Sequence, residues 1–134
     1  MTKRNEQEKF WTETYSKEYI RKNINFDNTL LIEGWTKMLK NIDVPSSILE
    51  CGANIGRNIF ALNKIFPNAK KTAIEISEDA SLILKKNFKN LNVINSSILE
   101  SEVAIKSFDL VFTMGVLIHI HPNMLKENLK KIIS

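Results

Sequence analysis

The spacing of hydrophobic residues changes at Pro45. Before this position apolar side chains recur every three or four residues, which is the period of a helix buried on one side. After it, short apolar runs alternate with helical stretches, a pattern typical of βαβ units and a parallel sheet. The chain is therefore expected to form one α/β domain over residues 1–134, with a helical cap over residues 1–44 and an alternating core over residues 45–134.

Two helices are expected in the cap. The first runs from Asn5 to about Lys22 and carries an aromatic face, and the second runs from about Asn28 to Lys40. Four strands are expected in the core, at Ile48–Cys51, Lys71–Ile76, Asn92–Asn95 and Phe108–Thr113.

Helices should connect and follow these strands. One is expected from Gly56 to about Phe66, with Ile59, Phe60, Leu62 and Ile65 facing the sheet. Another starts at Ser77, a good N-cap, and a last one starts at Pro122, where a missing N–H costs nothing. The crossover from Ser96 to Ser107 has room for only a turn of helix.

Composition adds that the chain has the size of a single globular domain, with 134 residues of which 43% are hydrophobic and 25% charged. No apolar stretch approaches the roughly 18 to 20 residues needed to span a bilayer, so a soluble cytoplasmic protein is expected. Cys51 is the single cysteine and lies among apolar neighbours, which favours burial over reactivity.

The net charge of +4 raises the question of nucleic-acid binding. Of the 19 basic residues, 16 are Lys, and they are scattered along the chain without a basic run. Arg is the side chain suited to forked phosphate recognition, so the charge pattern disfavours a nucleic-acid partner.

The segment from Glu50 to Asn58 lies where the first strand of the core passes into a helix. Gly52 and Gly56 suit a tight turn that a ligand approaches closely, although an ordinary glycine turn explains them equally well. Asn54 and Arg57 replace two glycines of the dinucleotide motif G-x-G-x-x-G, which disfavours a pyrophosphate. An acidic Glu50 under the loop suits a positively charged ligand.

Glu75, at the end of the second strand, supports the ligand-binding interpretation. It follows Gly52 by 23 residues, the place from which an acidic side chain reaches the two hydroxyls of a ribose. The alternative is a solvated glutamate at a strand end.

The segments ILECGANIGRNIF, TAIEIS, VINSSILE and SFDLVFTMGVLIHIHP resemble motifs I to IV of class I S-adenosylmethionine-dependent methyltransferases. Within that family, ECGANIGRN, FTMGVLIHIHP and the N-terminal FWTETYSKEYIRKN are similar to methylases of pseudaminic acid biosynthesis. The resemblance implies a Rossmann-like sheet of strand order 3-2-1-4, without the fifth to seventh strands of the family, and S-adenosylmethionine as cofactor.

The resemblance also implies roles for individual residues. The methionine end of the cofactor would be held by the loop after the first strand, the ribose by Glu75, and the adenine by Ile76 together with Ser97 and Ile98, which replace the family's usual acidic residue. Backbone groups near the acceptor would come from the end of the fourth strand. The expected cofactor-binding residues are Tyr19, Arg21, Glu50, Gly52, Ala53, Asn54, Gly56, Glu75, Ile76, Ser97, Ile98, Thr113, Met114 and Gly115.

Two further features have two interpretations each, and a third has one. Tyr19 and Arg21 form either a lid over the cofactor or part of a packed aromatic helix. His119 is either a general base for a hydroxyl acceptor or a structural histidine. His119 and His121 have no supporting carboxylate or cysteine cluster, so no metal site is expected.

The resulting hypothesis is a methyltransferase acting on a small molecule such as a sugar. TMGV replaces the Pro-Pro aromatic tetrad with which amino-group methylases grip a flipped base. The alternative is a protein that binds S-adenosylmethionine as a sensor, sequestering agent or partner subunit without methyl transfer. The apolar fourth strand would lie at the edge of the sheet, which predicts a homodimer or a higher symmetric oligomer.

Overall fold

The structure is a computed structural model that describes residues 28–114 and 122–133. The helix expected from Asn5 to Lys22 lies outside these residues. The second expected helix is present as α3 (Thr29–Met38).

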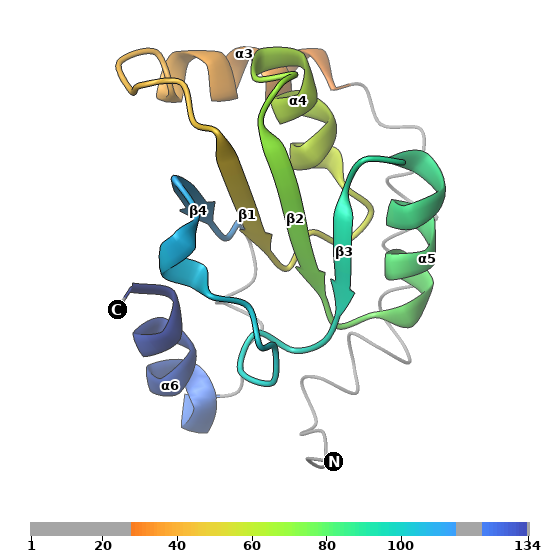
Figure 1. Cartoon of the computed structure of the whole chain (residues 1–134), viewed down its shortest axis with the longest axis vertical. Helices are drawn as coiled ribbons and strands as arrows, with labels where there is room; N and C mark the ends of the chain where they lie inside the picture. Colours follow the sequence, from red (N-terminus) through yellow and green to blue (C-terminus); the bar gives the residue numbers. More distant parts are fainter. Residues whose placement is uncertain (1–27, 115–121, 134) are drawn as a thin grey trace.

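Four parallel strands form the sheet, in the order β3-β2-β1-β4 (Figure 1). They are β1 (Ser47–Cys51), β2 (Lys70–Glu75), β3 (Asn92–Asn95) and β4 (Leu110–Phe112). β1 pairs with β2 on one side and β4 on the other, so it is a central strand. The order agrees with the Rossmann-like fold predicted from the sequence.

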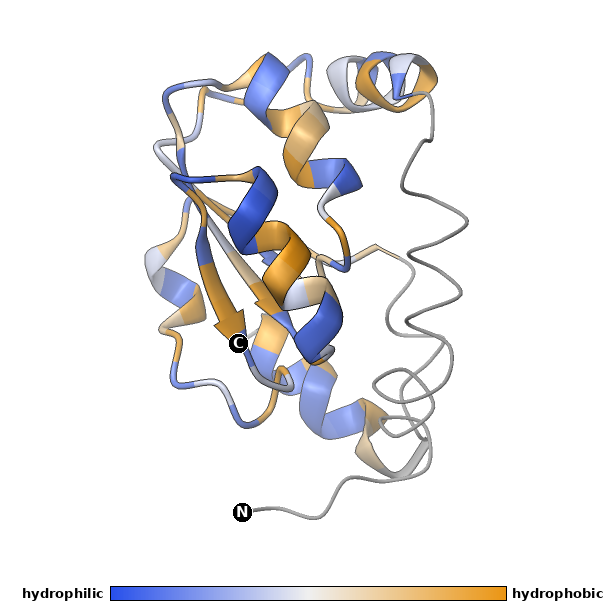
Figure 2. Cartoon of the chain, turned by 90° about the vertical axis from the view of Figure 1, so that its right-hand side faces the viewer, coloured by the Kyte–Doolittle hydropathy of each residue, from blue (hydrophilic) through white to orange (hydrophobic). Residues whose placement is uncertain are grey.

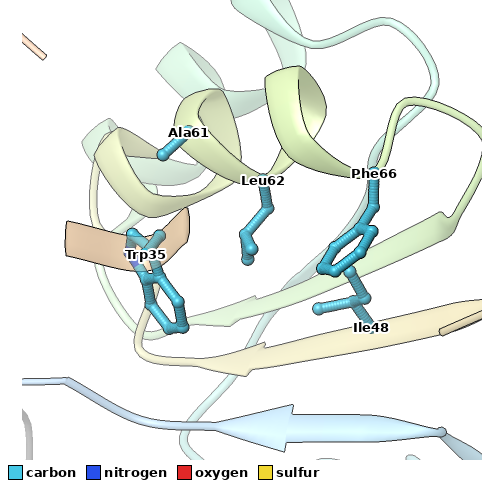
Figure 3. Packing of buried hydrophobic residues seen from close by; sticks show 5 residues of the cluster. All are labelled: Trp35, Ile48, Ala61, Leu62 and Phe66. Carbon is cyan, nitrogen blue, oxygen red and sulfur yellow. The ribbon is translucent and has the colours of Figure 1, made fainter. Parts of the chain in front are cut away.

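One face of the sheet is covered by α3, α4 (Arg57–Ile65) and α5 (Glu78–Asn87). Ile48 of β1 packs there against Leu62 and Phe66, and Trp35 of α3 completes the cluster (Figure 3). The edge of the Trp35 ring meets Phe112 of β4, with ring centroids 4.8 Å apart. This contact ties α3 to the strand at the edge of the sheet.

The opposite face is covered by the chain between β3 and β4 and by α6 (Pro122–Ile133). Successive side chains of a strand point to opposite faces, so Leu49 and Cys51 lie on this side, against Ile98, Ile105 and Ile132. Hydropathy follows this layering, because the strands are largely apolar whereas the helices carry apolar and polar residues side by side (Figure 2).

Most of the predicted elements are confirmed to within two residues. Ser77 caps α5 as expected, since its side chain accepts a hydrogen bond from the Ala80 N–H at 3.2 Å. The crossover after β3 contains a single 3₁₀ turn, η2 (Ile105–Ser107). Cys51 is fully buried, as expected.

Two expectations were wrong in detail. β4 is shorter than predicted because the Asp109 N–H donates to the Ser47 hydroxyl, at 3.0 Å, rather than extending the ladder. Phe60 points away from the sheet and is 37% exposed, since Ile59 and Leu62 take the inner face of α4. The Phe60 ring instead lies under Lys64, whose Nζ is 5.4 Å from the ring centroid.

Candidate functional site

The order of the sheet places a crevice at the carboxyl end of β1. From β1 the chain continues to β2 and β3 on one side of β1. It then crosses back to β4, which pairs with β1 on its other side. In open α/β sheets ligands bind outside the strand ends at such a reversal. The loop of residues 52–56 therefore occupies the expected position of a binding site (Figure 1).

The loop of residues 52–56 contains three residues in left-handed conformations. They are Gly52 with φ 83°, Asn54 with φ 51° and Gly56 with φ 89°. Glycine and asparagine are the residues that adopt this conformation at least cost. The start of the loop is held to β2, because the Gly52 and Ala53 N–H groups both donate to the Ile74 carbonyl, at 2.7 and 3.2 Å.

Gly56 is required by packing as well as by its backbone conformation. A Cβ at this position would lie 2.5 Å from Cε2 of Phe88 and 2.8 Å from Cδ2 of Leu84. The N-terminus of α4 thus rests directly on the end of α5. The structure explains this glycine without any ligand, and the role predicted for it in cofactor binding stays a prediction.

Glu75 is confirmed at the end of β2, where its carboxylate joins two loops. Oε1 accepts the Asn54 N–H at 2.7 Å, and Oε2 accepts the Ser77 N–H at 2.7 Å. Burial raises the pKa of Glu75, and the backbone hydrogen bonds from Ser77, Asn54 and Ile76 act in the opposite direction. The carboxylate is 6% exposed and lies beside the loop after β1, where the sequence placed a ribose.

Glu50 lies beneath the same loop and is 1% exposed. Its Oε2 accepts a hydrogen bond from Nδ2 of Asn58 at 2.8 Å. Burial raises the pKa of Glu50 to about 8, the bond from Asn58 counteracts the rise in part, and the nearby Glu75 adds to it. Burial thus favours the protonated form of this carboxyl group near neutral pH.

Two buried oxygen atoms at this end of β1 find no hydrogen-bond donor among the residues that the structure describes. They are Oε1 of Glu50 and Oδ1 of Asn54. A buried polar atom without a partner is costly, and each one calls for an explanation. Asn54 Oδ1 and the ionised form of Glu50 would both accept hydrogen bonds here, which matches a ligand that brings N–H donors.

The residues predicted to contact the adenine differ in how far they are buried. Ile76 and Ser97 are half-buried after β2 and β3, but Ile98 is 7% exposed and belongs to the core cluster with Leu49 and Cys51. The Ser97 hydroxyl accepts the Glu100 N–H at 3.1 Å and so holds the turn after β3. Ile98 therefore has a core role that the sequence did not predict.

At the end of β4, the Thr113 hydroxyl donates to the Cys51 carbonyl at 2.9 Å, and Met114 is 43% exposed. Thr113 thus fixes the end of β4 to β1, beside the loop of residues 52–56. Ala53 is 5% exposed, and its side chain packs in the core with Ala73 and Leu84. Only the backbone of Ala53 could therefore contact a ligand at this loop.

Four of the predicted residues lie outside the described part of the chain: Tyr19, Arg21, Gly115 and His119. Within residues 28–114 and 122–133, no group of three or more His, Cys, Asp or Glu side chains is arranged to hold a metal ion. None of the helices described is long and apolar enough to cross a membrane.

Sequence reasoning did not assign functional roles to Asn58 and Trp35. The Trp35 indole Nε1 donates to Oδ1 of Asn58 at 3.0 Å, and Asn58 in turn donates to Glu50. A sequence signal for Asn58 existed, because asparagine is a poor helix former yet stands in the first turn of α4.

Comparisons with known proteins identify the family and the fold of the chain. A profile of the family described as "Methyltransferase domain" matches residues 48–134. The chain is 30% identical over 94 residues to a chemotaxis protein methyltransferase of Vibrio anguillarum, an alignment that covers 69% of this chain and 34% of the relative.

Solved structures with the same fold include the plantazolicin methyltransferase BpumL in complex with SAH, with a TM-score of 0.73 and 22% identity. That match covers 95% of this chain and 51% of BpumL. The sugar N-methyltransferase KedS8 from Streptoalloteichus sp ATCC 53650 gives a TM-score of 0.68 at 16% identity, covering 90% of this chain and 48% of KedS8. The chain thus spans about half the length of these structures and about a third of the curated relative.

Proposed function

Since the chain belongs to the methyltransferase domain family, which matches residues 48–134, we propose that it binds S-adenosylmethionine and transfers its methyl group to a small molecule. The observation that carries this proposal is a pair of buried oxygen atoms at the carboxyl end of β1, Glu50 Oε1 and Asn54 Oδ1, to which no described residue donates a hydrogen bond. A ligand with an ammonium group would supply such donors.

The residues present fit this cofactor at its other contacts too. Glu75 places a buried carboxylate one strand away from Glu50, where a charge-assisted bond to a ribose hydroxyl would be stronger than a neutral one. Gly52 carries no side chain at the turn, so its backbone leaves room for a close approach. Ile76 and Met114 offer apolar surface at the ends of β2 and β4. Under this proposal the fold contacts both the charged and the apolar parts of the cofactor.

In the proposed mechanism the protein contributes orientation and exclusion of water, because the cofactor already carries an activated methyl group. When bound, S-adenosylmethionine would supply a methyl group on a cationic sulfonium, whose methyl carbon a nucleophile attacks in line while the bond to sulfur breaks and S-adenosylhomocysteine leaves. The residues of the chain orient this centre and exclude water, and positioning of this kind can contribute on the order of 7 to 11 kcal/mol toward lowering a barrier.

His119 is proposed as a general base for a hydroxyl acceptor, since an imidazole titrates near working pH. It follows β4 in the sequence, and the acceptor is proposed to approach at the end of that strand, near Thr113 and Met114. Tyr19 and Arg21 are proposed to close over the carboxylate of the cofactor.

The acceptor is proposed to be a sugar or a related metabolite. Support comes from the resemblance of ECGANIGRN and FTMGVLIHIHP to methylases of pseudaminic acid biosynthesis and from the structural likeness to a sugar N-methyltransferase. We place the protein in the cytoplasm, where S-adenosylmethionine is made and used.

Two measurements test the proposal. Calorimetry with S-adenosylmethionine and, separately, with NAD should show binding of the first compound alone. Incubation with S-adenosylmethionine labelled on its methyl group and a small-molecule fraction of a cell extract should then yield labelled product. Binding without any labelled product would favour the alternative of a sensor or partner subunit, and binding of NAD alone would overturn the proposal.

A further inference from the structure

Three polar groups form a chain of hydrogen bonds from α3 to the candidate site. The Trp35 indole N–H donates to Oδ1 of Asn58 at 3.0 Å, and Nδ2 of Asn58 donates to Oε2 of Glu50 at 2.8 Å. Trp35 and Glu50 are 3% and 1% exposed, so water does not compete freely for these bonds.

The direction of this chain is fixed by Trp35. An indole N–H is a donor only, so the side-chain oxygen of Asn58 must face it, and the amide nitrogen must then face Glu50. With the amide flipped, the Asn58 NH₂ group would face the Trp35 N–H, so that two donors met. The Asn58 oxygen would then face an ionised Glu50, so that two acceptors met. Asn58 can therefore donate to Glu50 but cannot accept its proton.

A donor fixed on one oxygen of Glu50 determines what the other oxygen does. Oε2 is occupied as an acceptor, whereas Oε1 is buried without a partner among the described residues. A proton on the neutral acid then resides on Oε1, and a ligand that donates to Oε1 must displace it.

We propose that Asn58, held in one orientation by Trp35, is a positioning residue that reserves Oε1 of Glu50 for an N–H donor of the bound cofactor, and that binding releases the Glu50 proton. This inference rests on the proposed function, since it requires a cofactor with a cationic amino group. Under this proposal α3 influences binding through Trp35 and Asn58, although α3 itself does not contact the ligand.

The surroundings of Glu50 support release of a proton on binding. The groups that face it are the Asn58 amide from α4, the Trp35 indole beyond it from α3, the Phe112 ring paired with it on β4 and the Glu75 carboxylate from β2, while the adjacent Cys51 thiol lies on the opposite face of the sheet. Of these, Glu75 is the charged one, and its charge opposes ionisation of Glu50. A cationic ligand reverses that balance.

The experiment measures the affinity for S-adenosylmethionine by calorimetry between pH 6 and pH 7.5, below the range in which an α-amino group itself loses its proton. Wild-type affinity should rise by up to about tenfold per pH unit, because one proton must leave Glu50. Titrations in buffers with different heats of ionisation should show the proton released.

Asn58→Asp keeps the shape of the side chain but replaces the donor with an acceptor. The new carboxyl group would accept from both Trp35 and protonated Glu50, so the affinity at pH 7 should fall at least about tenfold and the pH profile should move upward. Trp35→Phe removes the indole N–H together with part of the packing against Phe112, so it should lower stability, and it should shift the affinity in the same direction by a smaller amount. Asn63→Ala, on the same helix, is the matched control and should bind as the wild type does.

Each outcome decides the inference. Wild-type protein that binds S-adenosylmethionine with an affinity independent of pH, or an Asn58→Asp variant with unchanged affinity and profile, overturns it while leaving the proposed function intact. Wild-type protein that does not bind at any pH overturns both. If Asn58→Asp does not fold, the proton count of the wild type and the Trp35→Phe variant still decide.

Discussion

Glu75 Oε1 accepts the backbone N–H of Asn54 at 2.7 Å, so the end of β2 holds the loop that follows β1. The same carboxylate accepts the Ser77 N–H through its other oxygen. A side chain expected to bind a ligand thus already fixes the shape of the loop beside it. Removal of the Glu75 side chain should therefore lower both the stability of the protein and its affinity for the cofactor, and the two effects can be measured separately.

Glu75→Ala should weaken binding of S-adenosylmethionine by about thirtyfold, because a charge-assisted contact worth roughly 2 kcal/mol is lost. Calorimetry measures this change. Glu75→Gln keeps one acceptor for a loop N–H, so it should retain more stability than Glu75→Ala while still losing most of the affinity. Glu78→Ala, an exposed change in the first turn of α5, is the control. Unchanged affinity in Glu75→Ala would contradict the role assigned to the end of β2.

Gly56→Ala should destabilise the protein by about 2 to 3 kcal/mol, since the new methyl group would overlap Phe88 and Leu84 and the residue has a φ of 89°. Urea unfolding followed by circular dichroism measures this loss. Gly34→Ala is the matched control, because a Cβ at Gly34 meets nothing within 4 Å and the residue lies inside α3. That control should gain about 0.5 to 1 kcal/mol. Equal effects of the two changes would show that the contact with α5 is unimportant.

How far the sequence predicted this structure depends on the kind of signal. The βα pattern, the glycines of the loop and the Ser77 cap act locally, and each was found where it was expected. The position of Glu75 at a strand end followed from the same local pattern.

Contacts between distant segments could not be predicted in this way. Asn58 accepts a hydrogen bond from Trp35, which lies 23 residues earlier in the sequence. Neither residue type by itself indicates which distant residue will be its partner. The core packing of the Ile98 side chain against Leu49 and Cys51 is another such contact, and the role predicted for Ile98 in cofactor binding stays a prediction. Phe60 was assigned to the core because an apolar residue was assumed to face inward, whereas the phase of α4 turns it outward.

Self-association through β4 remains a prediction. Among the described strands β4 pairs with β1 alone and lies at the edge of the sheet, with apolar Leu110, Val111 and Phe112. Unpaired N–H and C=O groups on an edge strand readily pair with another chain. Light scattering at micromolar concentration should therefore give at least twice the chain mass of 15.4 kDa. A monodisperse mass of 15.4 kDa would rule the dimer out.

The last prediction concerns the effect of pH on stability. Burial raises the pKa of Glu50 from 4.5 to about 8, so the folded protein keeps a proton that the unfolded chain has lost between these values. The folded state binds more protons there, and the free energy of unfolding must fall as the pH rises through this window. Glu50→Gln stays neutral at every pH, so relative to the wild type it should gain about 1 kcal/mol for each pH unit between pH 6 and pH 8. Urea unfolding at pH 6, 7 and 8 measures the difference, with Glu33→Gln on the exposed side of α3 as control. A constant difference between Glu50→Gln and the wild type would mean that Glu50 is ionised in the folded protein, and the binding-linked release of its proton would then be excluded as well.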